Sequence, residues 1–333
     1  MRKTILVSLG LVTLTLFSCK EKNDSLGSSS TVVSSEAFNP RKLDTLGSRY
    51  NELGRFSGSI LVAEDGEVVY QNFFGKADYG SDKPFSKSTV FSLGDFSELI
   101  LNGSEVKADS LEVKSRKAVV ALIEELDLQN TFLQKEAPQN AAKGYIHSIG
   151  PDGPETTPAP QDTELQLWTN ATNLQKLIAT IAGESLVQDG YSETGGFSYA
   201  IRKNQNLSVI VLSNRRHPVT GEMAESIEQL WKREPYQLPL LRKETKVSPA
   251  LLQEFAGSYE LGPGAELKVV TENDSLFVFM GPQKVHLKPQ SENQFFMANT
   301  EAAIRFERDS TGRVASAELL DGFLSGKEIP KIR

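Results

Sequence analysis

Two short groups of side chains in this sequence are of types that could take part in a reaction. Asp95, Ser97 and Glu98 lie within four consecutive positions, and Glu193-Thr194-Gly195 follows far along the chain. A serine hydroxyl attacks a carbonyl group when a neighbouring base removes its proton. Carboxylates act as general acids and bases or hold a cation. No basic residue stands at helical spacing from Ser97. The adjacent Glu98 could not serve as its base either, because neighbouring side chains on a helix point in different directions.

Each of these residues also has a purely structural explanation. Asp is among the best N-cap residues, and a Glu three positions later completes a capping-box pattern, so Asp95 and Glu98 are typical of a helix start. Asp95, Glu98 and Glu193 would bind a cation only if they met in one cleft. His147 has no visible partners for a catalytic triad. We expect no catalytic residue, cofactor or metal ion, and keep Ser97 or a carboxylate pair as the catalytic alternative.

Composition excludes several classes of function. The chain has 333 residues, which suggests two domains, and a formal charge of −7. No run of Lys and Arg stands out, so a nucleic-acid partner is not expected. The single cysteine excludes disulfides and cysteine-based metal sites within the chain. None of the three histidines has a second His at metal-ligand spacing.

The first residues have the pattern of an export signal. Arg2 and Lys3 precede an apolar run too short for a stable transmembrane helix. Leu16-Phe17-Ser18-Cys19 resembles the lipobox of bacterial lipoproteins, in which the chain is cut before the cysteine and the thiol carries a lipid. Residues 20–24 resemble the export tails of Bacteroidetes surface lipoproteins. The resemblance implies a lipid bilayer as partner and a location in the cell envelope, at the outer membrane, facing the periplasm or the surface.

Hydrophobic periodicity and turn residues outline a first domain of helices and antiparallel strands. Asn39-Pro40 is a helix-start signal, and Asp65-Gly66 between two apolar runs is a hairpin signal. Residues 134–163 contain five prolines and are expected to form a long polar loop. The pattern predicts helices over 40–53, 115–126, 172–182 and 222–231 and strands over 57–64, 67–74, 197–203 and 207–214.

The pattern changes after residues 233–247, where two prolines and a mixed charge run mark a domain boundary. Beyond it, short apolar runs alternate with turn signals such as Gly262-Pro263-Gly264, which predicts an all-β barrel or sandwich-like domain. The expected division is a signal peptide over 1–18, a lipidated Ser-rich tether over 19–39, a first domain over 40–235, a linker over 236–247 and a C-terminal β domain over 248–333.

Several strings, taken in order, resemble the serine β-lactamase and penicillin-binding-protein family, particularly its class C-like branch. They are residues 56–63 with the following Asp65-Gly66, residues 89–94, residues 126–131 and residues 209–215. Residues 250–333 resemble the small β domain often appended to such hydrolases. The resemblance implies an α+β fold, with a truncated β-lactamase/transpeptidase-like antiparallel sheet, flanking helices and a small all-β domain after it.

The family's catalytic motifs are altered in this chain. Its serine-x-x-lysine motif aligns with Asp95-Phe96-Ser97-Glu98, so both catalytic positions hold carboxylates. Its middle Tyr or Ser motif has no counterpart in the short stretch between Gly94 and Leu126. Its Lys or His, Thr or Ser, Gly motif aligns with Glu193-Thr194-Gly195, where an anion replaces the cation. We expect a catalytically inactive protein that binds or scaffolds a protein, peptide or glycan at the envelope. Two alternatives stay open: a hydrolase that uses non-standard residues, and a ligand or glycan binder that acts through the C-terminal domain.

Overall fold

The computed structural model contains helices and strands in both parts of the chain, which confirms the predicted α+β class. Cys19 and the expected signal peptide lie outside the described residues. Within the described part of the chain, no helix is long and apolar enough to cross a membrane. The described residues are 30–33, 39–102, 116–150, 153–160, 164–192, 194–217, 219–280, 283–297, 302–320 and 325–333.

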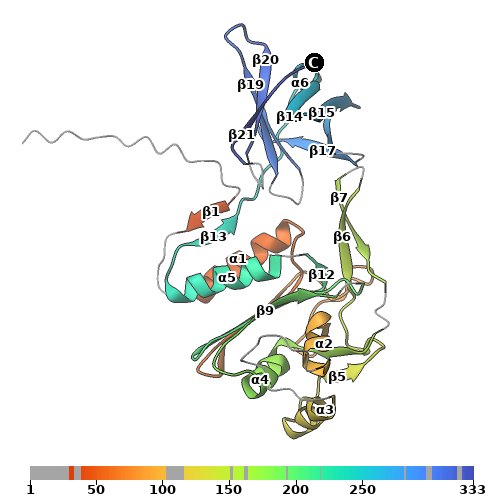
Figure 1. The fold of residues 1–333 in the computed structure, drawn as a ribbon, viewed down its shortest axis with the longest axis vertical. Coiled ribbons are helices and arrows are strands. Elements are labelled where there is room, and N and C mark those ends of the chain that lie inside the picture. The colour runs from red at the N-terminus through yellow and green to blue at the C-terminus, as the bar shows by residue number, and fades with distance from the viewer. Residues whose placement is uncertain are drawn as a thin grey trace, which may run out of the picture.

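An antiparallel sheet of five strands forms the centre of the first domain, in the order β3-β2-β11-β10-β9, and Figure 1 labels its edge strand β9. The strands are β2 (Gly58–Glu64), β3 (Glu67–Phe74), β9 (Leu186–Tyr191), β10 (Ser198–Lys203) and β11 (Leu207–Ser213). The turn between β2 and β3 has Asp65 and Gly66 at positive φ, as the hairpin signal requires. The edge strands β3 and β9 each have one strand neighbour in this sheet.

Helices cover both faces of this sheet, because alternate residues of β2 enter two different cores. Ile60 and Val62 pack with α1 (Pro40–Glu52) and α5 (Val219–Lys232). Leu61 and Ala63 belong to the opposite core, which contains residues of α2 (Asp95–Asn102), α3 (Arg116–Glu125) and α4 (Ala171–Ile181). The cap of α1 is the predicted one, since the Asn39 side chain accepts a hydrogen bond from the Arg41 amide.

Two three-stranded sheets complete the first domain, and one of them corrects a prediction. The orders are β4-β8-β5 and β12-β6-β7. The predicted long loop over 134–163 is wrong in part, because it contains the hairpin of β6 and β7. Pro154 and Pro158 lie on β7, an edge strand, where a residue without an amide N–H is tolerated. The strands are β4 (Phe91–Ser92), β5 (Thr131–Gln134), β6 (Tyr145–Gly150), β7 (Gly153–Pro158), β8 (Gln166–Thr169) and β12 (Arg215–Arg216).

A further strand pair joins two segments that the sequence indicated as irregular. β1 (Ser30–Val33), within the expected tether, pairs antiparallel with β13 (Tyr236–Pro239), within the expected linker. Tyr236 and Leu238 are buried against the core of α1 and α5, whereas Gln237 between them is exposed. This alternation is the burial pattern of a strand, and it keeps the chain extended as it leaves the first domain.

The C-terminal part is the predicted all-β domain, an eight-stranded antiparallel sheet with one short helix, α6 (Pro249–Phe255). The sheet closes toward a barrel, since Tyr259 on its first strand forms a bridge with Lys331 after its last strand. Phe255 of α6 stacks on Phe306 inside this domain, with ring centroids 4.5 Å apart. The strands are β14 (Gly257–Gly262), β15 (Ala265–Glu272), β16 (Ser275–Met280), β17 (Gln283–Pro289), β18 (Gln294–Met297), β19 (Ala303–Arg308), β20 (Val314–Leu319) and β21 (Lys327–Pro330).

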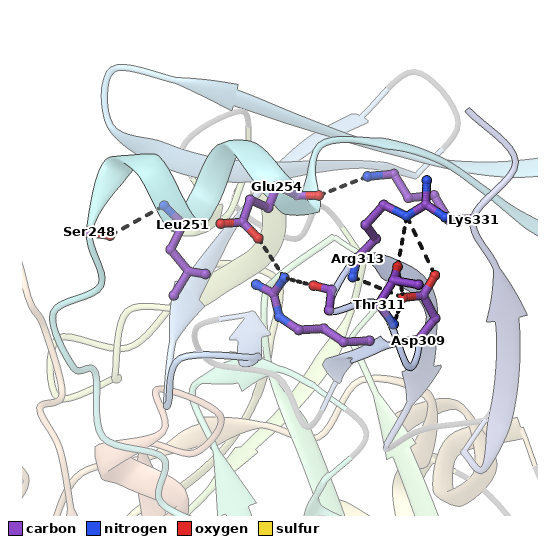
Figure 2. Close-up of polar contacts among 9 residues, drawn as sticks. Ser248, Leu251, Glu254, Asp309, Thr311, Arg313 and Lys331 are labelled. Atoms are coloured by element: carbon purple, nitrogen blue, oxygen red, sulfur yellow. Dashed lines mark hydrogen bonds and ion pairs between the residues drawn. The ribbon is translucent and has the colours of Figure 1, made fainter.

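Polar contacts cap the first turn of α6 and fix its last turn to the barrel (Figure 2). Ser248 caps the helix through the Leu251 amide. At the other end, Glu254 accepts a hydrogen bond from Arg308 at 2.6 Å, and its backbone oxygen accepts one from Lys331 at 2.9 Å. These contacts hold Phe255 in the interior, so the hydrophobic core of the C-terminal domain includes the helix.

Candidate functional site

The candidate site lies where α2 begins against the edge strand β9. Gly94, just before the helix, has φ of +49°, a conformation that glycine adopts easily. A Cβ atom on Gly94 would lie 2.3 Å from the backbone oxygen of Tyr191, so only glycine allows this approach. Phe96 and Ile100 anchor the helix in the core beneath. The result is that Asp95, the first residue of α2, is held beside the end of β9.

Asp95 forms a pair with Tyr199 of β10. The Tyr199 hydroxyl donates a hydrogen bond to Asp95 Oδ1 at 2.8 Å. Asp95 is exposed as a residue, but its carboxyl packs against β9 and β10. This partial burial raises the pKa of the carboxyl above its usual value, while the Tyr199 hydroxyl and nearby backbone amides act in the opposite direction. Burial also raises the pKa of Tyr199, and the neighbouring Asp95 charge adds to that effect. The phenol therefore keeps its proton and serves as a hydrogen-bond donor. The sequence predicted Asp95 as the N-cap, the residue just before the helix. In the structure Asp95 is instead the first residue of the helix.

Ser97 is buried, and its hydroxyl takes part in two hydrogen bonds within the fold. Its exposed fraction is 0%. Ser97 Oγ donates to Gln166 Oε1 at 3.2 Å and accepts a hydrogen bond from the Leu167 amide at 3.0 Å. The Ser92 hydroxyl donates to the same oxygen of Gln166. These bonds join α2 to β8, and they leave the Ser97 hydroxyl unavailable to a substrate. The side chain of Glu98 lies outside the described residues.

Gly190 on β9 is the site residue that sequence reasoning missed. A Cβ atom on Gly190 would lie 2.3 Å from Asp95 Oδ1 and 2.3 Å from the Tyr199 hydroxyl oxygen. No side chain fits at this position while the Asp95–Tyr199 pair is in place. The strand position nearest to Asp95 therefore holds no cation. A glycine inside a strand often marks the close approach of another group, so Asp189-Gly190 was the available signal.

Thr194 and Gly195 of the predicted strand motif lie in a turn after β9 rather than on the strand. Gly195 packs closely against Gly144. A Cβ atom added to Gly144 would lie 1.7 Å from the backbone oxygen of Gly195. The Gly195 amide donates to Ser192 Oγ at 2.7 Å, and Thr194 is exposed. Glu193 lies outside the described residues, as does the side chain of Glu98, so the structure does not test whether these carboxylates meet Asp95 in one cleft. Among the described residues, no group of three His, Cys, Asp or Glu side chains could hold a metal ion.

Two arginines that contact residues of β9 have partners of their own. Arg202 of β10 is only 8% exposed and donates to both carboxylate oxygens of Asp189, with Nη2–Oδ2 at 2.8 Å. Glu228 of α5 lies 3.8 Å from the same guanidinium group. Arg216 lies over the ring of Tyr191, 4.7 Å from its centre. The guanidinium of Arg202 is therefore neutralised within the fold, on the α5 face of the sheet, whereas Asp95 lies on the opposite face.

Comparison with known proteins gives a family match and a curated relative. Residues 241–328 match the model of a domain of unknown function, DUF3471. A stretch of 105 residues is 29% identical to penicillin-binding protein 4* of Bacillus subtilis (strain 168). That alignment covers 30% of this chain and 23% of the relative, so the chain matches less than a quarter of the relative's length.

Two solved structures, one of them of a penicillin-binding protein homologue, are also similar to this chain. The octameric penicillin-binding protein homologue from Pyrococcus abyssi has a TM-score of 0.44 and 13% identity, over 87% of this chain and 99% of that chain. FmtA from Staphylococcus aureus has a TM-score of 0.42 and 13% identity, over 61% of this chain and 92% of that chain. The residues of the chain itself must therefore decide what the site can do.

Proposed function

We propose that the protein is a lipid-anchored, catalytically inactive relative of the serine β-lactamases and penicillin-binding proteins, with a binding or scaffolding role at the bacterial cell envelope. The lipid would be attached to Cys19, with the protein at the outer membrane. The similarity to penicillin-binding proteins supports the family assignment. The arrangement around Asp95 supports the loss of activity.

The observation that carries the proposal is the packing of Asp95, Tyr199 and Gly190. Acyl transfer by a serine enzyme needs an accessible nucleophile, a base that activates it and donors for the developing oxyanion. Here the helix start presents a carboxylate that is hydrogen-bonded to a phenol. The hydroxyl two residues later, that of Ser97, is buried and engaged by Gln166 and Leu167. The facing strand position, Gly190, has no room for a cationic side chain.

An active hydrolase that uses non-standard residues is the second candidate, and one observation favours it. Asp95 has a raised pKa at a helix start, and perturbed carboxyl groups are common in active sites. Ser97 does not support this candidate because its exposed fraction is 0%. Among the side chains placed around Asp95, an active enzyme would therefore have to use the Asp95 carboxylate itself as base or nucleophile.

The third candidate, ligand binding through the C-terminal domain, receives less support. The interior of the barrel is occupied by the packed rings of Phe255, Phe295 and Phe306, with centroid distances of 4.5–5.6 Å. An interior filled in this way has the character of a hydrophobic core rather than of a ligand cavity. A ligand of this domain would therefore bind on its outer surface.

Activity-based labelling of the purified full chain tests the proposal directly. The chain is incubated with a fluorophosphonate probe and with a fluorescent penicillin, and acylation is measured by intact mass beside an active penicillin-binding protein. We expect no adduct. Stoichiometric acylation by either probe would contradict the proposal. Hydrolysis of an ester or a cephalosporin that Asp95→Asn abolishes would instead support the second candidate, because that variant keeps the shape of the side chain.

A further inference from the structure

An open groove with a mixed polar and apolar lining lies on the first domain at β5, which Figure 1 shows in the lower part of the molecule. Its volume is about 640 Å³. It shares no residue with the candidate site around Asp95. Its lining combines one aromatic ring, three primary amides, one proline and one ammonium group, from Phe132, Gln134, Gln139, Asn140, Pro138 and Lys83.

The walls of the groove are fixed by hydrogen bonds before any ligand arrives. Asn140 Nδ2 donates to the Ser88 backbone oxygen and to Asn130 Oδ1, at 2.5 and 3.1 Å. The Asn140 backbone oxygen accepts from the Val90 amide, which ties the loop to the strand region near β4. Lys83 lies in a tight turn in which its backbone bonds to Asp78 and Ala77. A preformed site of this kind avoids the entropic cost of ordering loops on binding.

The amides of the groove present hydrogen-bond acceptors and donors together. Asn140 uses its NH₂ group within the protein, and Gln134 donates to the Glu136 backbone oxygen at 2.7 Å. The side-chain carbonyl oxygens of both residues therefore stay available as acceptors. Gln139 is exposed and can both donate and accept. A ligand that matches this set must carry groups that donate and accept at short spacing, as hydroxyl groups do.

The remaining two side chains narrow the class of ligand further. Phe132 packs on the core with part of its ring and lines the groove with the rest, which offers an apolar face to the flat side of a sugar ring. Lys83 is exposed and has no ion pair with another described residue, so its ammonium group can attract an anion. Hydroxyl groups, an apolar ring face and one negative charge are the features of an acidic sugar.

We propose that this groove binds a short oligosaccharide that carries a carboxylate. Lys83 pairs with the carboxylate, Phe132 lies beneath a sugar ring, and the amides of Gln134, Gln139 and Asn140 bond to its hydroxyl groups. The inference gives the proposed binding role a ligand class and rests on that role. It places the ligand away from Asp95, in a part of the first domain to which the catalytic resemblance assigns nothing.

Calorimetric titration of the full mature chain with trigalacturonic acid, and with maltotriose as the neutral comparison, tests the groove. We expect the acidic trisaccharide to bind more tightly and to lose affinity as salt is added. Lys83→Met should weaken that binding about tenfold, since a hydrogen bond to a charged group is lost. Gln139→Ala should weaken both saccharides. The matched control is Lys135→Met, which removes an exposed lysine next to Gln134 that does not line the groove.

The outcomes separate this inference from the proposed function. Absence of binding by both saccharides at millimolar concentration overturns the groove proposal, as does an equal effect of Lys83→Met and Lys135→Met. Loss of binding in Asp95→Ala with none in Lys83→Met would place the ligand at the old catalytic site, which keeps a binding role and overturns the groove. Acylation of the wild-type chain, measured separately, would overturn the proposed function without bearing on the groove. Thermal unfolding of each variant shows whether it is folded.

Discussion

The hydroxyl of Tyr199 on β10 donates a hydrogen bond to the carboxylate of Asp95 on α2, across 2.8 Å. The pair joins the first turn of a helix to the central sheet, and the glycine at position 190 leaves the space that the pair occupies. Asp95, which the sequence resemblance aligns with a nucleophile position, is thus part of the packing between two elements. This relationship leads to the first two predictions.

Replacing Asp95 by Asn should make the protein less sensitive to pH. Because the folded-state pKa of Asp95 is raised above its usual 3.8, the folded state binds its proton more tightly than the unfolded state does. The resulting stability is present below that usual value and is lost as pH rises through the folded-state pKa. Asn keeps an acceptor for Tyr199 and carries no charge. The free energy of unfolding of Asp95→Asn, relative to wild type, should therefore increase from pH 4 to pH 7, as measured by urea denaturation. If the difference in unfolding free energy between Asp95→Asn and wild type were the same at pH 4 and pH 7, the raised pKa of Asp95 would be contradicted.

Replacing Gly190 by Ala should destabilise the protein, and removing the Tyr199 hydroxyl should restore part of the loss. The added Cβ would lie 2.3 Å from two oxygen atoms, and overpacking of this kind costs about 1–3 kcal/mol. Tyr199→Phe removes one of these atoms. Urea denaturation of the two single variants and the double variant gives the coupling between the sites. Val187→Ala, at a 71% exposed position on the same strand, is the control and should change little. Additive effects would show that Gly190 and Tyr199 are not in contact.

Restoring the family's nucleophile motif should not restore activity. Asp95→Ser with Glu98→Lys supplies a serine and a lysine at the correct spacing, but the adjoining position on β9 is still a glycine without a cation. Catalytic groups act together, so restoring some of them leaves the activity limited by those that are still missing. Intact-mass measurement after incubation with penicillin should show no acyl-enzyme. An adduct in the double variant would mean that the rest of the site is still competent.

Cys19 should determine where the protein is found in the cell. Replacing Cys19 by Ser removes the thiol that would carry the lipid, so the protein should move from the membrane fraction to the soluble fraction. Cell fractionation followed by immunoblotting measures the change, and a Ser18→Ala variant that keeps the cysteine is the control. Recovery of Cys19→Ser in the membrane fraction, released only by detergent, would refute lipidation at this position.

A fragment of residues 248–333 should fold without the first domain. Its core is built from its own strands and α6, including the stacked rings of Phe255 and Phe306. Thermal unfolding followed by circular dichroism should show one cooperative transition. Phe255→Ala in this fragment should lower its stability by about 3–5 kcal/mol, because the ring is fully buried. Gln253→Ala, on the exposed side of the same helix, is the matched control. A disordered spectrum of the unmodified fragment at low temperature would contradict the prediction.

The sequence predicted those elements whose determinants are local. Asp65-Gly66 identified the β2–β3 hairpin because its turn needs residues that tolerate positive φ, and Asn39-Pro40 identified the start of α1. Ser248-Pro249 is the same kind of signal and would have identified α6, which the strand pattern around it obscured. The β6–β7 hairpin was missed because its prolines suggested a loop, whereas its pairing with β12 depends on residues distant in sequence. Gly190 was missed for a similar reason, since the space it leaves is defined by Asp95 and Tyr199 on other elements.

The pairing of β1 with β13 also sets how far the folded part of the protein can stand from a bilayer. If Cys19 carries a lipid, as proposed, eleven peptide units lead from the anchor to Ser30, and a fully extended chain of that length spans at most about 40 Å. If β1 separated from β13, the extended linker would run from Cys19 to Pro40, and its maximum length would rise to about 75 Å. The four paired residues of β1 and β13 thus determine whether the folded domain stays close to the membrane anchor or can reach farther from it.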